Sequence, residues 1–166
     1  YKTAYQNLIV TGSVRNNLIK TICESIDHPN PKIAIIVQSL SHAQILVDML
    51  PNARKIEGMN SIDQRKDAIA WFKKTFKPVL IGTKILQTGI DIKEITHLII
   101  ARGLKSDIPT IQALGRSLRI DKDSDVFVYD FYDRDGAILE KHSKSRIRAY
   151  KREGHRPDII WKHNKN

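Results

Sequence analysis

Cysteine is nearly absent from this chain of 166 residues, because Cys23 is its one cysteine. A single cysteine excludes an internal disulfide, and a shared helical face with Ile19, Ile22 and Ile26 indicates a core thiol rather than a nucleophile. No apolar run approaches the roughly 20 residues that cross a bilayer, and no signal peptide is apparent. We therefore expect a soluble, intracellular chain, in the cytoplasm or nucleoid, with no membrane partner.

Recognisable metal and phosphate-loop motifs are also absent. The acidic run at Asp121, Asp123 and Asp125 lacks the glycine and glutamate positions of a calcium loop, and the histidines show no metal-ligand spacing. We therefore expect no metal site. Neither a G-x4-G-K-[ST] phosphate loop nor an acidic DE-x-[DH] motif after a strand occurs anywhere.

Positive charge is in excess and is unevenly distributed. The net charge is +10, and residues 134–166 contribute +6 of it, from ten Lys and Arg against four Asp and Glu. Such an excess attracts polyanions. It predicts contact with nucleic acid, although a solubilising charged tail explains it equally well. Tyr150, which lies among Arg146, Arg148, Lys151 and Arg152, is the candidate contact residue there, with a solvated basic helix as the alternative.

Apolar patterns alternate between buried strands and amphipathic helices. Continuous β-branched runs such as residues 32–38, KIAIIVQ, are typical of strands buried on both faces of a parallel sheet. The predicted strands are 32–38, 54–57, 79–82, 96–101 and 126–131. Three predicted helices span residues 13–26, 110–120 and 138–154. Another is capped by Ser39 or Ser41 and closed by Pro51. The last is opened by a capping box at Ser61–Gln64, with Ile69, Phe72 and Phe76 inward. This order predicts an open, mostly parallel α/β sheet with helices on both faces.

Ligands of such sheets gather at the carboxyl ends of the strands. The loops to watch are therefore 38–41, 58–61, 82–91 and 102–109. The third, GTKILQTGID, offers hydroxyls at Thr83 and Thr88 and two glycines that let an anion approach the backbone. A glycine-threonine loop that ends in a capping aspartate is also common without any such role.

The segment Thr110–Ile120, TIQALGRSLRI, carries the sharpest pattern. In a helix, Gln112, Arg116 and Arg119 fall within about 40° of one another on one face. Two parallel guanidiniums and an amide suit a polyphosphate, whereas the simpler interpretation is an amphipathic helix with a solvated basic face.

Four motifs in order resemble the second RecA-like domain of superfamily-2 helicases and translocases. They are IAIIVQS, the G-x6-R pair Gly58 and Arg65, VLIGTKILQTGID and QALGRSLR, which match motifs IV, IVa, V and VI. The resemblance covers about residues 32–132, and residues 138–154 are similar to the helix that follows this domain in the XPB, RadD and phage UvsW branch, with the UvsW group nearest. A viral origin is compatible with this resemblance.

The resemblance implies a role for each motif. Arg116 and Arg119 would be arginine fingers that stabilise charge on the γ-phosphate of ATP, and Gln112 would tie them to the cleft. Asp91 would contact the ribose and Gly89 the nucleotide, while Ser39, Gly58, Thr83 and Arg65 would contact the nucleic-acid backbone. ATP and Mg²⁺ would be held mainly by an N-terminal RecA-like domain of the same protein, because the phosphate loop is missing here.

Two departures from the motif qualify these roles. Gln112 stands where many of these helicases have histidine, which favours DNA over RNA without excluding RNA, and Leu118 replaces a glycine, which leaves the orientation of Arg119 less defined than that of Arg116. We divide the chain into an entry segment with the first helix (1–31), the RecA-like core (32–133) and a basic C-terminal helix and tail (134–166). The chain starts at Tyr1 rather than Met, and we expect it to be an ATPase half without hydrolysis of its own. The alternative is a non-catalytic α/β module that binds nucleic acid or protein.

Overall fold

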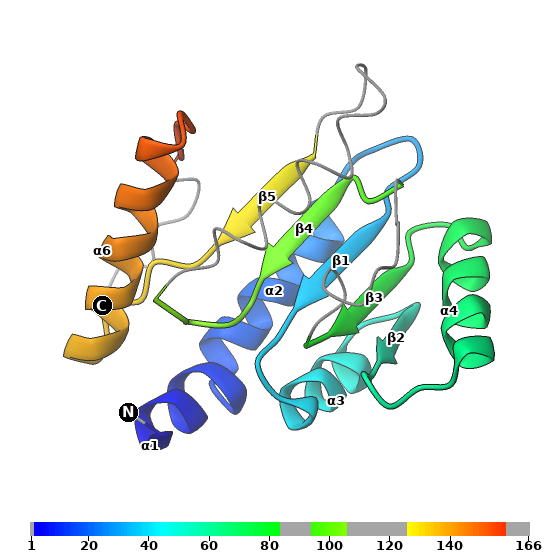
Figure 1. Cartoon of the computed structure of the whole chain (residues 1–166), viewed down its shortest axis with the longest axis horizontal. Helices are drawn as coiled ribbons and strands as arrows, with labels where there is room; N and C mark the ends of the chain where they lie inside the picture. Colours follow the sequence, from blue (N-terminus) through cyan, green and yellow to red (C-terminus); the bar gives the residue numbers. More distant parts are fainter. Residues whose placement is uncertain (1, 84–93, 106–125, 159–166) are drawn as a thin grey trace.

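A parallel β-sheet forms the centre of the computed structural model, which describes residues 2–83, 94–105 and 126–158. Its strands are β1 (Ile33–Ile36), β2 (Ala53–Ile56), β3 (Val79–Gly82), β4 (His97–Ile100) and β5 (Phe127–Asp130). They lie in the order β2-β3-β1-β4-β5, and every pairing is parallel (Figure 1). The predicted α/β fold is therefore confirmed. Four of the predicted strands contain the observed ones, and the predicted strand 54–57 is offset by one residue from β2.

Helices cover both faces of the sheet. Residues of α2 (Ser13–Ser25) and α3 (Leu40–Met49) share one core cluster with Ile33 and Ile35 of β1. Phe72 of α4 (Ile62–Lys74) shares the other cluster with Ala34 and Ile36. Successive β1 residues thus point into opposite cores, and this explains why the strand is a continuous apolar run.

The start of α4 confirms a local sequence signal. The Ser61 hydroxyl accepts from the Gln64 backbone N–H at 3.2 Å, and the Gln64 side chain accepts from the Ser61 N–H at 2.9 Å. Phe72 is fully buried as predicted, but the prediction for Phe76 is wrong, since its side chain is 66% exposed. The helix ends at Lys74, so Phe76 leaves the helical face on which its spacing had placed it.

Buried Lys32 joins α4 to β1. Its ammonium group donates to the backbone carbonyls of Phe72, Lys73 and Thr75 at 2.7–3.0 Å. These are carbonyls at the last turn of a helix, where cations are favoured. Burial lowers the pKa of Lys32. Cys23 is buried as predicted, and burial raises the pKa of its thiol to about 12.

The N-terminal segment packs beside the last described helix. It consists of a short helix α1 (Lys2–Tyr5) and one π-helical segment η1 (Gln6–Val10), which the sequence patterns did not predict. Tyr5, Ile9 and Val10 form a small core with Leu139 of α6 (Ala137–Arg152). α6 lies next to the edge strand β5 (Figure 1). Within the described residues, no helix is long and apolar enough to cross a membrane.

Candidate functional site at the carboxyl edge of the sheet

The strand register places the starts of the predicted loops in one row. Gly82 of β3 pairs with Ile56 of β2 and Ile36 of β1, and Ile36 pairs with Ile100 of β4, which pairs with Asp130. These five residues end their strands side by side, at the spacing of about 4.8 Å between neighbouring strands. The residues that follow them therefore form a continuous edge, as the sequence analysis predicted from the alternation of strands and helices.

Ser39 follows β1 at this edge and caps α3. Its hydroxyl accepts from the His42 backbone N–H at 3.3 Å and lies 3.0 Å from the Ser41 hydroxyl. Ser39 is half-buried, and Ser41 is exposed. The two hydroxyls and the N-terminus of α3 thus stand together at the centre of the edge, where backbone N–H groups and the helix dipole favour an anion.

Gly58 and Arg65 come together at the end of β2. The Arg65 guanidinium donates to the Gly58 carbonyl, which closes the turn between β2 and α4. Gly58 is exposed, and a Cβ added to it would meet nothing within 4 Å. The turn therefore does not need glycine for its own packing, and its backbone is open to a ligand.

Thr83 continues the row directly after β3. Its predecessor Gly82 accepts from the Val37 N–H at 3.1 Å, and Thr83 itself is half-buried. Ser39, Gly58, Arg65 and Thr83 are thus brought to one edge. The predicted nucleotide and finger residues Gly89, Asp91, Gln112, Arg116 and Arg119 lie outside the described residues.

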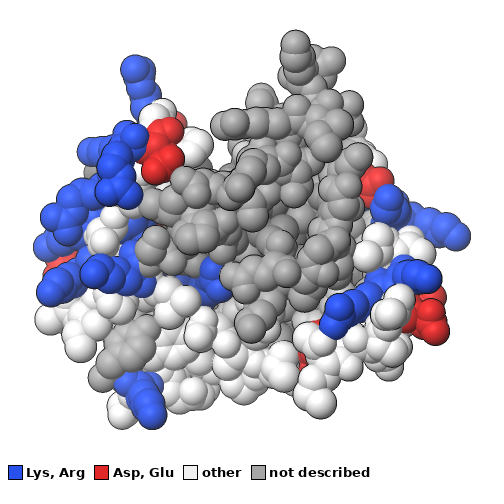
Figure 2. Space-filling view, viewed as in Figure 1, with Lys and Arg blue, Asp and Glu red and all other residues white. Residues whose placement is uncertain are grey.

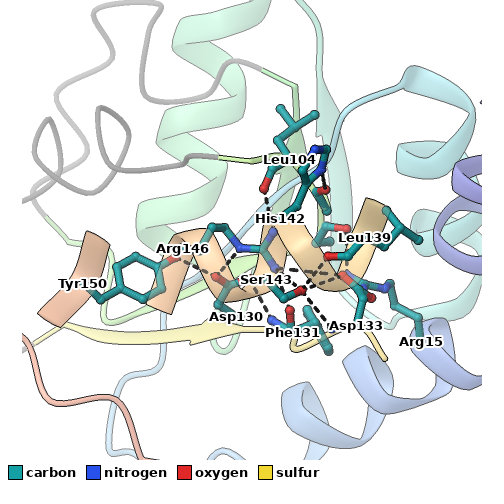
Figure 3. Close-up of polar contacts among 12 residues, drawn as sticks. Arg15, Leu104, Asp130, Phe131, Asp133, Leu139, His142, Ser143, Arg146 and Tyr150 are labelled. Carbon is teal, nitrogen blue, oxygen red and sulfur yellow. Dashed lines mark hydrogen bonds and ion pairs between the residues drawn. The ribbon is translucent and has the colours of Figure 1, made fainter. Parts of the chain in front are cut away.

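A buried guanidinium occupies the β5 end of the row (Figure 3). Arg146 of α6 is 1% exposed, and it donates to the Asp130 carboxylate at 2.8 Å and to the carbonyls of Leu104 and Phe131 at 2.6 Å each. Burial works to lower its pKa, but the Asp130 carboxylate outweighs this, so the pKa of Arg146 is raised. Arg146 therefore ties α6 to the segments that follow β4 and β5.

Asp133 makes a second connection beside the first. Its carboxylate pairs with Arg15 of α2, and its backbone N–H donates to the Ser143 hydroxyl at 3.0 Å. Arg15 also donates to the Ala101 carbonyl at 3.2 Å and stacks over the Phe131 ring at 4.6 Å. Two arginines and two aspartates thus join α2, the β4 and β5 ends and α6. A bidentate guanidinium suits such a joint better than an ammonium would.

Tyr150 belongs to this connection as well. It is 8% exposed, and its hydroxyl donates to the same Asp130 oxygen at 2.6 Å. A ring that stacks on a nucleic-acid base must expose its face, so this position argues against the predicted contact role. The structure instead gives Tyr150 and Arg146 an anchoring role for α6, which sequence reasoning missed. The signal was present, because Leu139, Ser143, Arg146 and Tyr150 repeat at the spacing of one helical face.

A buried histidine lies behind the row. His42 is fully buried, and its Nε2 lies 2.9 Å from Asn16 Oδ1. Because the Asn16 amide NH₂ donates to the Val10 carbonyl, its oxygen is the acceptor, and His42 donates from Nε2. Burial and, secondarily, the charge on Arg15 lower the pKa of His42 to about 4. His42 is therefore neutral at pH 7 and links α3 to α2 rather than to a ligand.

The parallel sheet, its two helical layers and the polar row at one edge define a RecA-like α/β domain. In such domains the loops at the carboxyl edge carry the ligand contacts. The chain belongs to the family of helicase conserved C-terminal domains, found in superfamily-2 helicases, and residues 15–121 match the model of that family.

Similar proteins include both DNA and RNA helicases. The chain is 24% identical over 164 residues to the ATP-dependent DNA helicase uvsW of Enterobacteria phage T4, an alignment that covers 86% of this chain and 33% of that protein. It is 30% identical over 120 residues to the DEAD-box ATP-dependent RNA helicase 57 of Arabidopsis thaliana, covering 70% of this chain and 22% of that protein.

The fold is shared with a solved structure of the same phage protein. The crystal structure of T4 UvsW superposes with a TM-score of 0.75 at 21% identity, over 92% of this chain and 35% of that one. The resemblance to helicase second domains, predicted from four motifs, is thereby confirmed. The chain spans about a third of the length of the phage relative.

Proposed function

We propose that this chain is the second motor domain of an ATP-dependent helicase or translocase that acts on DNA. In this role it contacts the nucleic-acid backbone and supplies arginine fingers to an ATP molecule bound mainly by an N-terminal RecA-like domain of the same protein. The observation that carries the proposal is the row at the carboxyl edge, where the helicase motifs of a family member stand side by side on parallel strands.

The nucleic-acid contacts of this proposal are Ser39, Gly58, Thr83 and Arg65. The Ser39 hydroxyl stands at a helix N-terminus, the Gly58 backbone is open, and Thr83 lies between them along the row. Hydroxyls and backbone N–H groups position a phosphate backbone without reading its sequence. Arg65 acts through the Gly58 turn, since its guanidinium holds the Gly58 carbonyl.

The nucleotide contacts are assigned to the motif residues outside the described ranges. Arg116 and Arg119 stabilise negative charge on the transferred γ-phosphate, Gln112 orients them, and Gly89 and Asp91 contact the nucleotide. Mg²⁺ and the β- and γ-phosphates are held by the partner domain, because this sequence has no phosphate loop. The DNA preference rests on Gln112 in place of histidine and on the similarity to the phage DNA helicase.

The test is Arg116→Ala in the full-length protein. Because a finger acts on charge that develops in the transition state, kcat for ATP should fall by about 10³-fold or more while the dissociation constant for DNA changes little. Lys74→Ala is the matched control, because the last turn of α4 contacts Lys32 at the start of β1 and so lies at the opposite edge of the sheet. Retained turnover in Arg116→Ala would remove the finger role.

A further inference from the structure

The outer face of α6 is a separate basic surface. Leu139, Ser143, Arg146 and Tyr150 point inward and are buried. The opposite face, about 120–220° around the helix from Leu139, carries five cationic side chains, and all of them are exposed: Lys141, Lys144, Arg148, Lys151 and Arg152. Figure 2 shows Lys and Arg gathered on the side of the molecule where α6 lies.

Three of these cations have no ion-pair partner among the described residues. Lys144 pairs with Glu140 at 2.7 Å, and Arg152 approaches Glu153 at 4.0 Å. No pair is formed within the described ranges by Lys141, Arg148 or Lys151, although the chain has acidic residues on both sides of them. Their charges are therefore available to an external anion.

The helix that carries them is fixed rather than loosely attached. Arg146 and Tyr150 hold Asp130 at the end of β5, and Ser143 holds Asp133, which is paired with Arg15 of α2 (Figure 3). A solubilising tail needs no such anchoring. Buried ionic connections of this kind fix geometry, because breaking one leaves an uncompensated charge. The cations are thus held in a constant arrangement on the surface.

The spacing of the cations suits a sugar-phosphate backbone. At a rise of about 1.5 Å per residue, Arg148 and Lys151 are separated by about 4.5 Å along α6, and Lys141 and Arg148 by about 10.5 Å. These separations are comparable with one and two steps between neighbouring phosphates on one strand. An amphipathic membrane helix would need an exposed apolar face. Leu139 of α6 is buried against Tyr5, Ile9 and Val10 of the N-terminal segment, and Ile138 is the one large apolar residue of this helix that is exposed.

We infer that the outer face of α6 binds the backbone of duplex nucleic acid, through Lys141, Arg148 and Lys151, as a second contact surface distinct from the strand-end row. The inference goes beyond the proposed function, because it does not depend on the finger residues or on the edge of the sheet. Arg146 and Tyr150 hold the surface in place and do not touch the ligand.

The test compares two triple variants with the same loss of charge. In one, Lys141→Gln, Arg148→Gln and Lys151→Gln are combined. In the control, Lys20→Gln, Lys73→Gln and Lys74→Gln remove three cations from α2 and α4 near the opposite edge of the sheet. Binding of each chain to a fluorescent 20-base-pair DNA duplex, and to an RNA duplex of the same sequence, is measured by anisotropy between 50 and 200 mM salt. Circular dichroism melts verify that each variant is folded.

Each phosphate contact contributes about 0.9 to the slope of log K against log salt, so the α6 triple should reduce the slope by 2 to 3 and weaken duplex binding by about tenfold or more at 50 mM salt. The control triple should change the slope by less than about 1. The exchange Lys141→Arg, Arg148→Lys and Lys151→Arg should restore binding. If the α6 triple loses binding to both duplexes, the surface recognises the sugar-phosphate backbone in general. If it loses binding to only one duplex, the surface recognises the helix form of that duplex.

The inference is overturned if both triples weaken binding equally, since total charge then explains the effect. It is also overturned if the α6 triple keeps the wild-type slope, or if it loses binding to phosphatidylserine vesicles and not to either duplex. Failure of Arg116→Ala to stop ATP turnover would remove the proposed function and leave this result unchanged, so the two failures are distinguishable.

Discussion

At the scale of single residues, Arg146 is the side chain of α6 whose loss we expect to lower the free energy of unfolding most. It satisfies one carboxylate and two backbone carbonyls while 1% exposed. Arg146→Met should lower the free energy of unfolding by about 3–5 kcal/mol, because Asp130 is left charged in a largely buried position. The measurement is urea unfolding at pH 7.

Arg148→Met is the matched control for this prediction, because Arg148 lies on the exposed face of the same helix. Its effect on stability should stay within about 0.5 kcal/mol. Arg146→Lys should fall between the two, since an ammonium keeps the charge but cannot reach three acceptors with the geometry of a guanidinium. Equal losses at positions 146 and 148 would contradict the anchoring role.

His42 makes the stability of the fold depend on pH. Its pKa is lowered from 6.5 to about 4 in the folded chain, chiefly by burial. Between these values the unfolded chain binds more protons than the folded one, so the free energy of unfolding is highest above about pH 6.5 and falls as the pH drops toward 4. His97, whose pKa is also lowered to about 4 by burial, acts in the same direction.

His42→Gln should make this dependence shallower. The amide of glutamine can still donate to Asn16 but does not titrate, so the loss of stability between pH 7 and pH 4.5 should shrink by on the order of 2 kcal/mol. Urea unfolding at several pH values measures it. His155→Gln, at an exposed position after α6, is the control for the substitution itself, and its free energy of unfolding at pH 7 should stay within about 0.5 kcal/mol of the wild type. An unchanged profile in His42→Gln would contradict the assignment.

At the scale of elements, two glycines have different roles: Gly12 allows close packing, and Gly58 leaves the backbone open to a ligand. A Cβ on Gly12, at the N-cap of α2, would lie 2.3 Å from the Leu8 carbonyl oxygen of η1, whereas a Cβ on Gly58 would meet nothing within 4 Å. Gly12→Ala should therefore destabilise the chain by about 1–3 kcal/mol, because backbone must shift. Gly58→Ala should leave stability unchanged and weaken nucleic-acid binding several-fold, measured by urea unfolding and anisotropy.

The two variants serve as controls for each other, since both add one methyl group at an exposed or half-exposed loop. If Gly58→Ala binds like the wild type, the backbone of that turn does not approach the nucleic acid. If Gly12→Ala is as stable as the wild type, the junction of η1 and α2 adjusts without cost.

Elements with local signals were predictable from the sequence, and long-range contacts were not. β1 was identified because its residues face two cores, and α4 because Ser61 and Gln64 cap each other through bonds that span three residues. The roles of Arg146 and Tyr150 depend on Asp130 and Leu104, which are distant in sequence. A buried and an exposed arginine look alike in composition. Nucleic-acid contact and a solubilising tail therefore explained the basic C-terminal segment equally well, and neither interpretation distinguished Arg146 from Arg148.

The candidate site was predictable to the extent that topology determines it. Parallel strands bring their carboxyl ends together, so Ser39, Gly58 and Thr83 were expected at one edge before any contact was known. Their detailed partners were not expected. Arg65 holds the carbonyl of the glycine with which it forms the G-x6-R pair, and this side-chain contact across seven residues follows from the turn rather than from periodicity.

At the scale of the whole molecule, the chain has the family fold but only some of the sequence motifs that ATP hydrolysis requires. It belongs to the helicase C-terminal domain family, yet its sequence contains no phosphate loop and no acidic magnesium motif. Arginine fingers stabilise charge on a phosphate that other groups must hold and align. The chain alone should therefore bind nucleic acid in a salt-dependent manner and hydrolyse no ATP.

This last prediction is measured as phosphate release by the 166-residue chain with ATP, Mg²⁺ and duplex DNA, beside the full-length protein at equal concentration. The full-length protein should turn over ATP, and phosphate release by the 166-residue chain should stay at the level of a buffer blank. DNA binding by the chain in the same buffer verifies that it is folded. Turnover that rises in proportion to the concentration of the chain and disappears in its Arg116→Ala variant would mean that the chain holds a complete site of its own. The proposal that one RecA-like domain holds ATP and the other supplies the arginine fingers would then be wrong. The fold and the row of strand-end residues would be unaffected.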